Sequence, residues 1–157
     1  MPIYMKYPNA NGDVKATGYE NYIECSSFQY GVGRTIPAPT VGAGADRETD
    51  KAHVSEIILT KTMDGATPAL YQESLKGKGK EVLIAFVEGT ESRLYTKYTL
   101  TNTLISSYTM SSGGERPSES LSLNFTEIMT EFFQRDAEHD DGDQPKVKYN
   151  LATNELS

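Results

Sequence analysis

Polar and apolar residues alternate with a period of two along much of the chain, the pattern of half-buried β-strands. The alternation is clearest in residues 93–100 and 103–110. In the first run it puts one set of residues on the same face: Leu94, Thr96, Tyr98 and Leu100. In the second run the corresponding residues are Leu104, Ser106, Tyr108 and Met110. Residues 81–88 are apolar on both faces, as in a strand covered on both sides. Further strands are expected at 3–7, 20–30 and 54–61.

The stretch SSGGERPSESLSLNFTEI adds a turn and another strand to this series. Leu121, Leu123 and Phe125 share one face, but the next apolar residue, Ile128, is out of phase. A β-bulge near residues 126–127 would restore the inward direction, and bulges are common where a sheet curves. We therefore predict a mainly β fold, a compact antiparallel β-barrel of about seven or more strands.

One short flanking helix is predicted at about residues 67–77. Thr67 is a good N-cap, and Pro68 suits the first helical position. Tyr71 and Leu75 lie one turn apart and are expected to face the sheet, because so short a helix must dock to be stable. Gly77 is expected to end the helix in the left-handed conformation.

Two segments lack any periodicity. Residues 31–53 form a long extended loop rich in Gly and Pro, and loops of this length inside a domain are usually functional or disordered. Residues 135–146 form a polar, acidic segment. The whole chain, residues 1–157, is expected to be a single domain.

The composition argues against several classes of function. The formal charge of −7 argues against a nucleic-acid-binding surface, which needs clustered Lys and Arg. With Cys25 as the one cysteine, an intramolecular disulfide is excluded. No N-terminal apolar run resembles a signal peptide, and no segment approaches a membrane span. We expect a protein that folds in the cytoplasm or leaves the cell without a cleaved signal, and that binds no membrane.

No catalytic, cofactor or metal site emerges from the motifs. The glycines of residues 111–117 precede a strand and lack the Lys and following helix of a phosphate loop, so a turn is the better interpretation. The acidic run 136–143 does not have EF-hand spacing. His53 and His139 lie in polar segments outside any known motif, and Cys25 is expected to fill space in its strand. Glu56 and Glu127 are the acidic residues nearest to apolar strand ends.

The order of the segments resembles the haemolysin-coregulated protein (Hcp) family of bacterial type VI secretion systems. The stretches that carry the resemblance are GYENYIECSSFQYGVGR, VSEIILTKTMDGATPALYQESLKGK, LTNTLISSYTMSSGGERPSESLSLNFTEI and PKVKYNLATNE. The resemblance covers nearly the whole chain. It implies a structural protein, not an enzyme, that forms hexameric rings. These rings stack into a tube inside a contractile sheath, and the tube is secreted with effector proteins held in its lumen.

The resemblance also implies roles for particular residues. The long loop would reach the neighbouring ring, and its centre, expected to mediate ring stacking, comprises Val41, Gly42, Ala43, Gly44, Ala45 and Asp46. If Phe28 and Tyr30 point into the core, alternation turns Ser27 and Gln29 the other way. We expect those two side chains to face the lumen. The partners implied are other copies of the chain, secreted effectors, and the spike and sheath of the machine.

Two other functions fit the same pattern of elements. The first is a tail-tube protein of a phage or a related contractile injection device. The second, of another class, is a small β-barrel hydrolase that uses carboxylates, which would need two acidic side chains to converge in an apolar pocket.

Overall fold

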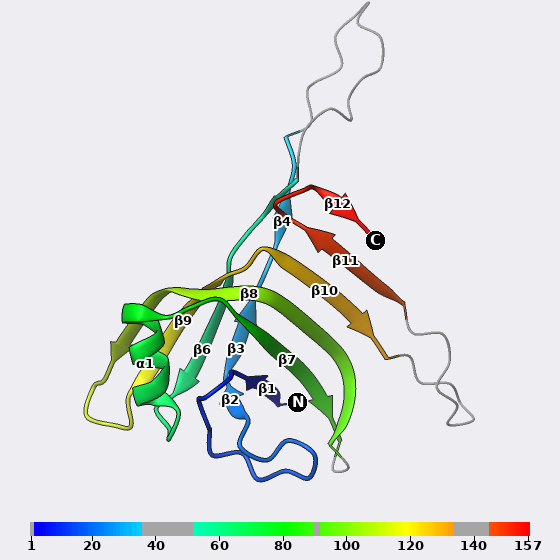
Figure 1. The fold of residues 1–157 in the computed structure, drawn as a ribbon. Helices are drawn as coiled ribbons and strands as arrows, with labels where there is room; N and C mark the ends of the chain where they lie inside the picture. The colour runs from blue at the N-terminus through cyan, green and yellow to red at the C-terminus, as the bar shows by residue number, and fades with distance from the viewer. Residues whose placement is uncertain (1, 36–51, 90–91, 134–144) are drawn as a thin grey trace, which may run out of the picture.

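The computed structural model describes residues 2–35, 52–89, 92–133 and 145–157, which form twelve strands and one helix (Figure 1). The helix α1 spans Thr67–Lys76. The strands are β1 (Ile3–Lys6), β2 (Ile23–Cys25), β3 (Ser27–Gln29), β4 (Val32–Gly33), β5 (His53–Val54), β6 (Ile57–Thr62), β7 (Lys80–Glu88), β8 (Arg93–Ser111), β9 (Ser118–Asn124), β10 (Glu127–Phe132), β11 (Lys146–Asn150) and β12 (Glu155–Leu156). The predicted mainly β class with one helix is confirmed.

The long strand β8 organises the sheet, and every pairing is antiparallel. Its first half lies between β7 and β10 in the order β12-β11-β10-β8-β7-β1-β2. Its second half pairs with β9, which continues to β6 and β3. Figure 1 shows β8 bending between the two halves, so that the two parts of the sheet enclose a common core.

The sheet is not closed into the expected barrel. Consecutive strands β2 and β3 belong to different parts of the sheet, β2 pairing with β1 and β3 with β6. Ser26 separates them, and its N–H donates to the carbonyl of Thr60 at 2.7 Å. The chain thus leaves one ladder and joins another at this residue, so the two parts meet at a corner instead of through a continuous ladder.

The core lies between the two parts of the sheet. Its side chains are almost fully buried and come from both parts; the largest are Met5, Ile23, Ile57, Leu59, Leu70, Ile84, Leu100, Leu121 and Leu123. Burial of each side chain of this size contributes about 1.5–3 kcal/mol. A smaller cluster around Tyr4, Ala85 and Val87 is covered by Tyr19 and Tyr22. The alternation in the sequence therefore identified the inward positions of most strands.

The β-bulge predicted near residues 126–127 is replaced by a break between two strands and a register shift in β8. The strand is interrupted between β9 and β10, and the register shift lies opposite, in β8 between Ile105 and Ser107. An extra residue in one strand reverses the direction of the side chains that follow. Ile105 is consequently buried and Leu104 exposed, so the prediction that Leu104 shares a face with Tyr108 is wrong.

The bounds of α1 agree with the prediction, but its contacts differ. The N-cap is Ala66, not Thr67, and Gly77 has an extended conformation with φ of −74° instead of a left-handed one. Leu70 is the side chain that α1 buries, whereas Tyr71 and Leu75 are 51% and 65% exposed. The expected docking face is therefore wrong for Leu75, whereas Tyr71 contacts the sheet at its edge, its ring centroid 5.6 Å from that of Tyr108.

The turn between β8 and β9 confirms the structural interpretation of the two glycines. Gly114 has φ of +106°, a conformation that side-chain-bearing residues rarely adopt. The Ser112 hydroxyl accepts from the Gly114 N–H at 3.3 Å and donates to the Glu115 carbonyl at 2.8 Å. Arg116 then donates to the Met63 carbonyl at 2.7 Å, tying the turn to the loop before α1.

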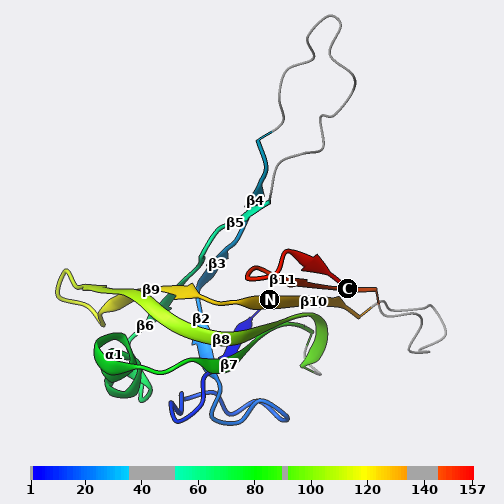
Figure 2. The same cartoon turned by 45° about the horizontal axis from the view of Figure 1, so that its top comes forward.

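The two ends of the long loop pair with each other. Val32 lies opposite Val54 and Gly33 opposite His53, in a two-stranded ladder that extends away from the main sheet (Figures 1 and 2). The expected ring-stacking residues Val41–Asp46 lie outside the described residues. Most of the acidic segment, residues 135–144, does as well.

Candidate functional site

The outer face of the β3-β6-β9-β8 ladder is covered by short hydroxyl side chains. In β9 the serines alternate with buried residues, so they point away from the core. The registers place them beside outward residues of β6 on one side and β8 on the other. We call this surface the hydroxyl face; it comprises Ser27, Gln29, Ile58, Thr60, Thr62, Ser107, Thr109, Ser111, Ser118, Ser120 and Ser122.

Ser27 and Gln29 occupy one edge of the hydroxyl face. Both are exposed, and Ser27 lies opposite Thr60 with their hydroxyl oxygens 2.5 Å apart. Between them, Phe28 packs against the core and stacks on the ring of Tyr98 at 5.1 Å. The prediction that Ser27 and Gln29 point away from the core is therefore confirmed, and β6, β9 and β8 extend their surface.

None of the eleven residues of the hydroxyl face is charged, and Glu56 borders the face, since it accepts from Ser106, whose hydroxyl also donates to the Ser122 carbonyl. Nine of its eleven residues are Ser or Thr, and Ile58 is the one large apolar side chain among them. The exposed Leu104, paired with Asn124, continues the same side of the ladder beyond Ser122. Protein interfaces that persist usually have an apolar core, and steering of charged partners needs charge of one sign. This surface has neither property, so it suits weak, hydrated contact.

A buried ion pair lies on the opposite side of the same two strands. Lys61 of β6 and Glu119 of β9 are paired in the ladder, and both side chains are fully buried. The Lys61 Nζ lies 3.2 Å from Glu119 Oε1 and 3.0 Å from Asp64 Oδ1. Thr67 Oγ1 donates to Glu119 Oε1 at 2.5 Å. The network thereby fixes the start of α1 to the sheet.

The same network explains why Thr67 is not the N-cap. Its hydroxyl accepts from the Asp64 N–H at 3.1 Å while it donates to Glu119, so it links the preceding loop to the sheet. On the other side of Glu119, burial and the nearby carboxylate raise the pKa of Tyr108 to about 12. Tyr108 is therefore protonated at any physiological pH. The sequence pattern predicted no buried ionic network at these residues.

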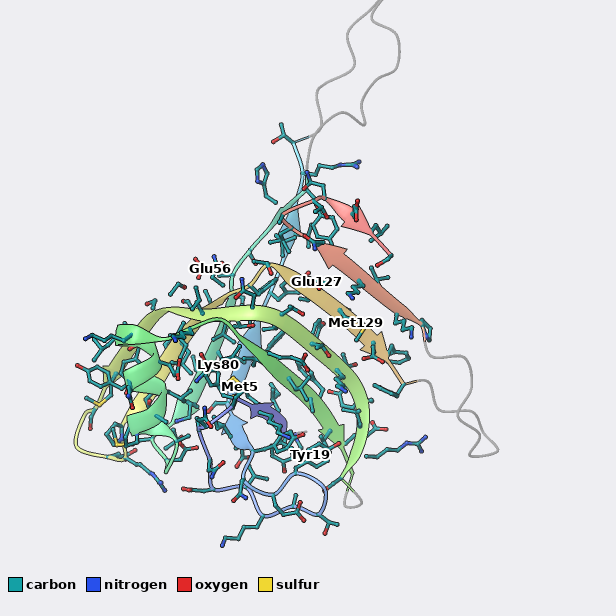
Figure 3. All side chains as sticks on the ribbon, viewed as in Figure 1. Met5, Tyr19, Glu56, Lys80, Glu127 and Met129 are labelled. Carbon is teal, nitrogen blue, oxygen red and sulfur yellow. The ribbon has the colours of Figure 1, made fainter. Side chains whose placement is uncertain are left out.

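The acidic residues considered for hydrolysis hold separate structural partners. Glu56 accepts from the hydroxyl of Ser106, and Glu127 lies 3.2 Å from Lys148 (Figure 3). Within the described part of the chain, no group of three or more His, Cys, Asp or Glu side chains could hold a metal ion.

A polar hollow near Asp13, Glu24 and Asp64 offers no better catalytic site. Asp13 accepts from the Gly65 N–H at 3.3 Å, and Asp64 is bound to Lys61. Cys25, which also lines this hollow, is buried, and burial raises the pKa of its thiol to about 12. Two of the three carboxylates at this hollow thus have partners within the subunit, and the cysteine is a core residue.

His53 is exposed on β5, opposite Gly33, and His139 lies outside the described residues. Among the helices in the described part, none is long and apolar enough to cross a membrane.

Similar folds occur among solved structures. A protein described as a type six secretion system protein is 23% identical, with 99% of each chain covered and a TM-score of 0.87. Hcp1 from Salmonella typhimurium is 19% identical over 99% of this chain and 98% of its own, with a TM-score of 0.76. A type VI secretion system effector from Yersinia pestis is 18% identical over 94% and 98%, with a TM-score of 0.75. At these identities the likeness establishes the fold.

The family follows from the sequence itself. No curated protein matches the chain significantly. A sequence model of the family described as "Type VI secretion system effector, Hcp" matches residues 4–132. The match includes most of β1, all of β2 to β10 and α1, and so both parts of the core. The chain belongs to the Hcp family of type VI secretion system proteins.

Proposed function

We propose that this chain is the structural subunit of a type VI secretion tube. Six copies form a ring, rings stack into a tube in the cytoplasm, and the tube is secreted with effector proteins inside. The family match over residues 4–132 is the observation that carries this proposal. The role requires self-association and contact with the spike and sheath, and it requires no catalysis.

The hydroxyl face supplies the inner surface of this tube. Ser27 and Gln29 belong to it, as the lumen-facing residues expected from the sequence, together with the serines of β9. An inner surface made mostly of short hydroxyl side chains, with little apolar area, would let effectors be held weakly and released. The absence of any charged residue among its eleven positions supports this assignment.

Cysteine labelling can test the ring and its inner surface together. Light scattering and negative-stain imaging should show rings of the Ser27→Cys variant. A small maleimide should label the introduced thiol equally in rings and in free subunits, because Ser27 is exposed in the single chain. A maleimide on a large polymer should react several-fold more slowly in the rings, where the lumen excludes it. Cys25 gives little background, because it is buried.

Two outcomes would contradict different parts of the proposal. A chain that stays monomeric at high concentration would contradict the tube. Rings in which both reagents react as fast as in free subunits would place the hydroxyl face on the outside. Thr109→Cys, on β8 at the other side of the hydroxyl face, should behave like Ser27→Cys.

The second part of the proposal is that the centre of the long loop, Val41–Asp46, mediates the stacking of rings. Removing Val41–Asp46 is expected to leave single rings intact but to impair stacking and secretion, because this segment would reach the next ring. Imaging should then show rings without tubes. Tubes and secretion at wild-type levels would contradict the assignment.

A further inference from the structure

The loop between β1 and β2 contains the one Asn-Gly dipeptide of the chain, Asn11–Gly12. Asparagine is among the thermolabile residues, and it is lost when the amide nitrogen of the next residue attacks its side-chain carbonyl carbon. A following glycine carries no side chain to hinder this attack and lets the backbone bend towards it. The sequence therefore makes Asn11 the most reactive asparagine of the chain.

The fold restrains the nitrogen that this reaction needs. The Gly12 N–H donates to the Asn21 carbonyl at 2.9 Å, and it has to lose this hydrogen bond before the nitrogen can attack. Gly12 is buried, and a Cβ at its position would lie 2.3 Å from the Tyr22 carbonyl oxygen. Asn11 itself is exposed. Packing against Tyr22 thus requires glycine after Asn11, while the hydrogen bond to Asn21 keeps the pair from reacting.

The same hydrogen bond belongs to a set that closes the loop of residues 11–22. The Val14 N–H donates to the Tyr22 carbonyl at 3.2 Å, and the Asn21 N–H donates to the Val14 carbonyl at 2.9 Å. The closed loop places Tyr19 and Tyr22 over the smaller cluster, on the side of the sheet away from the main core (Figure 3). The ring centroid of Tyr19 lies 5.3 Å from that of Tyr4. The loop therefore covers apolar surface only while its backbone bonds hold.

We propose that Asn11 is a site of spontaneous deamidation, that the closed loop suppresses this reaction, and that the product opens the loop irreversibly. The Gly12 nitrogen bonds to Asn11 Cγ and gives up its proton, while the Cγ–Nδ2 bond breaks and the side-chain nitrogen leaves as ammonia. Water then opens the resulting succinimide ring at either carbonyl, which gives aspartate or isoaspartate. In isoaspartate the main chain runs through the side-chain carbons and gains one methylene before Gly12. This reactivity does not depend on assembly into a tube.

The added methylene is incompatible with the close fit after Asn11. The bond to Asn21 and the contact with Tyr22 both depend on the position of Gly12, where the structure has no room for one more carbon. The isoaspartate chain is therefore expected to lose the Gly12–Asn21 bond and to uncover the smaller cluster. Aspartate differs, because it changes an exposed side chain and leaves the main chain as it was.

Incubation of the wild-type chain in mildly alkaline buffer, with and without guanidinium chloride, tests the reactivity. Peptide mass spectrometry should find the modification at Asn11 and not at Asn21, which is also exposed but precedes a tyrosine. The reaction should be at least about tenfold slower without denaturant, because it has to wait for the loop to open. Asn11→Gln should remain unmodified over the same time.

Tyr19→Ala tests whether closure of the loop is what protects Asn11. This variant removes the ring that packs on Tyr4, so it should raise the rate in buffer several-fold towards the rate in denaturant. Tyr71→Ala removes an exposed tyrosine of α1 and should leave the rate unchanged. If circular dichroism shows that Tyr19→Ala is unfolded, Tyr19→Leu repeats the test with a smaller change. Equal rates for the wild type with and without denaturant, or an unchanged rate in the Tyr19 variant, would overturn the protection.

Hydrogen exchange tests the effect of the product on the loop. The amides of Gly12, Val14 and Asn21 should be protected in the wild type and should lose this protection in the isoaspartate form, once chromatography has isolated it. Asn11→Asp carries the new charge without the added methylene, so it should keep the protection. An isoaspartate form with wild-type protection would overturn the opening of the loop. Loss of protection in Asn11→Asp would overturn the role of the added methylene.

Discussion

Replacing Lys61 with methionine is expected to lower the free energy of unfolding by about 3–5 kcal/mol. The substitution keeps the length of the side chain but removes the cation that lies 3.2 Å from the buried Glu119 carboxylate. An unpaired carboxylate in the interior loses its hydration without compensation. Asp64 loses the same partner, and the anchoring of α1 through Thr67 is weakened. Urea unfolding at one fixed protein concentration measures the change.

An exposed ion pair provides the matched control. Lys148 and Glu127 are also 3.2 Å apart and also join neighbouring strands, but their side chains are 48% and 21% exposed. Lys148→Met is therefore expected to cost less than about 1 kcal/mol. Equal losses from Lys61→Met and Lys148→Met would show that burial does not decide the energy of these pairs.

The double variant separates the ion pair from simple packing. Lys61→Met with Glu119→Leu removes both charges, and exchange of a buried pair for apolar residues is often neutral or stabilising. We expect it to recover most of the loss of the single variant, so the two substitutions are strongly non-additive. A double variant that is less stable than Lys61→Met would contradict this account.

The buried pair also shows where the sequence carried a signal that could have been recognised. Lys61 is in phase with Ile57 and Leu59, and Glu119 is in phase with Leu121. A charged residue at an inward position of a strand suggests a buried partner. The partner itself could not be identified, because the two residues are 58 positions apart and only the register of β6 and β9 brings them together.

The hydroxyl face was predictable to a similar extent. Alternation placed Ser27 and Gln29 outward, and it also places Ser120 and Ser122 outward within β9. That these residues form one surface depends on strand order, which local pattern does not specify. The open corner at Ser26 escaped prediction for the same reason, since residues 20–30 read as one strand although β2 and β3 pair with different neighbours.

The helix shows the opposite case, in which local rules located an element but not its contacts. Residues 67–77 carry a clear helix signal, and α1 spans Thr67–Lys76. The apolar positions of so short a helix permit more than one docking face. The choice was made by tertiary packing of Leu70 and by the network at Thr67, neither of which is visible in local periodicity.

Alanine substitutions on α1 are expected to show this difference directly. Leu70→Ala should lower the free energy of unfolding of the subunit by about 2–5 kcal/mol, because it leaves a cavity at a side chain with no exposed surface. Leu75→Ala changes the same residue type half a helix away, where the side chain is 65% exposed, and should stay within about 0.5 kcal/mol. Urea unfolding at a concentration where subunits are free removes any contribution from assembly. A larger loss from Leu75→Ala than from Leu70→Ala would mean that α1 docks through the Tyr71 and Leu75 face that the sequence predicted.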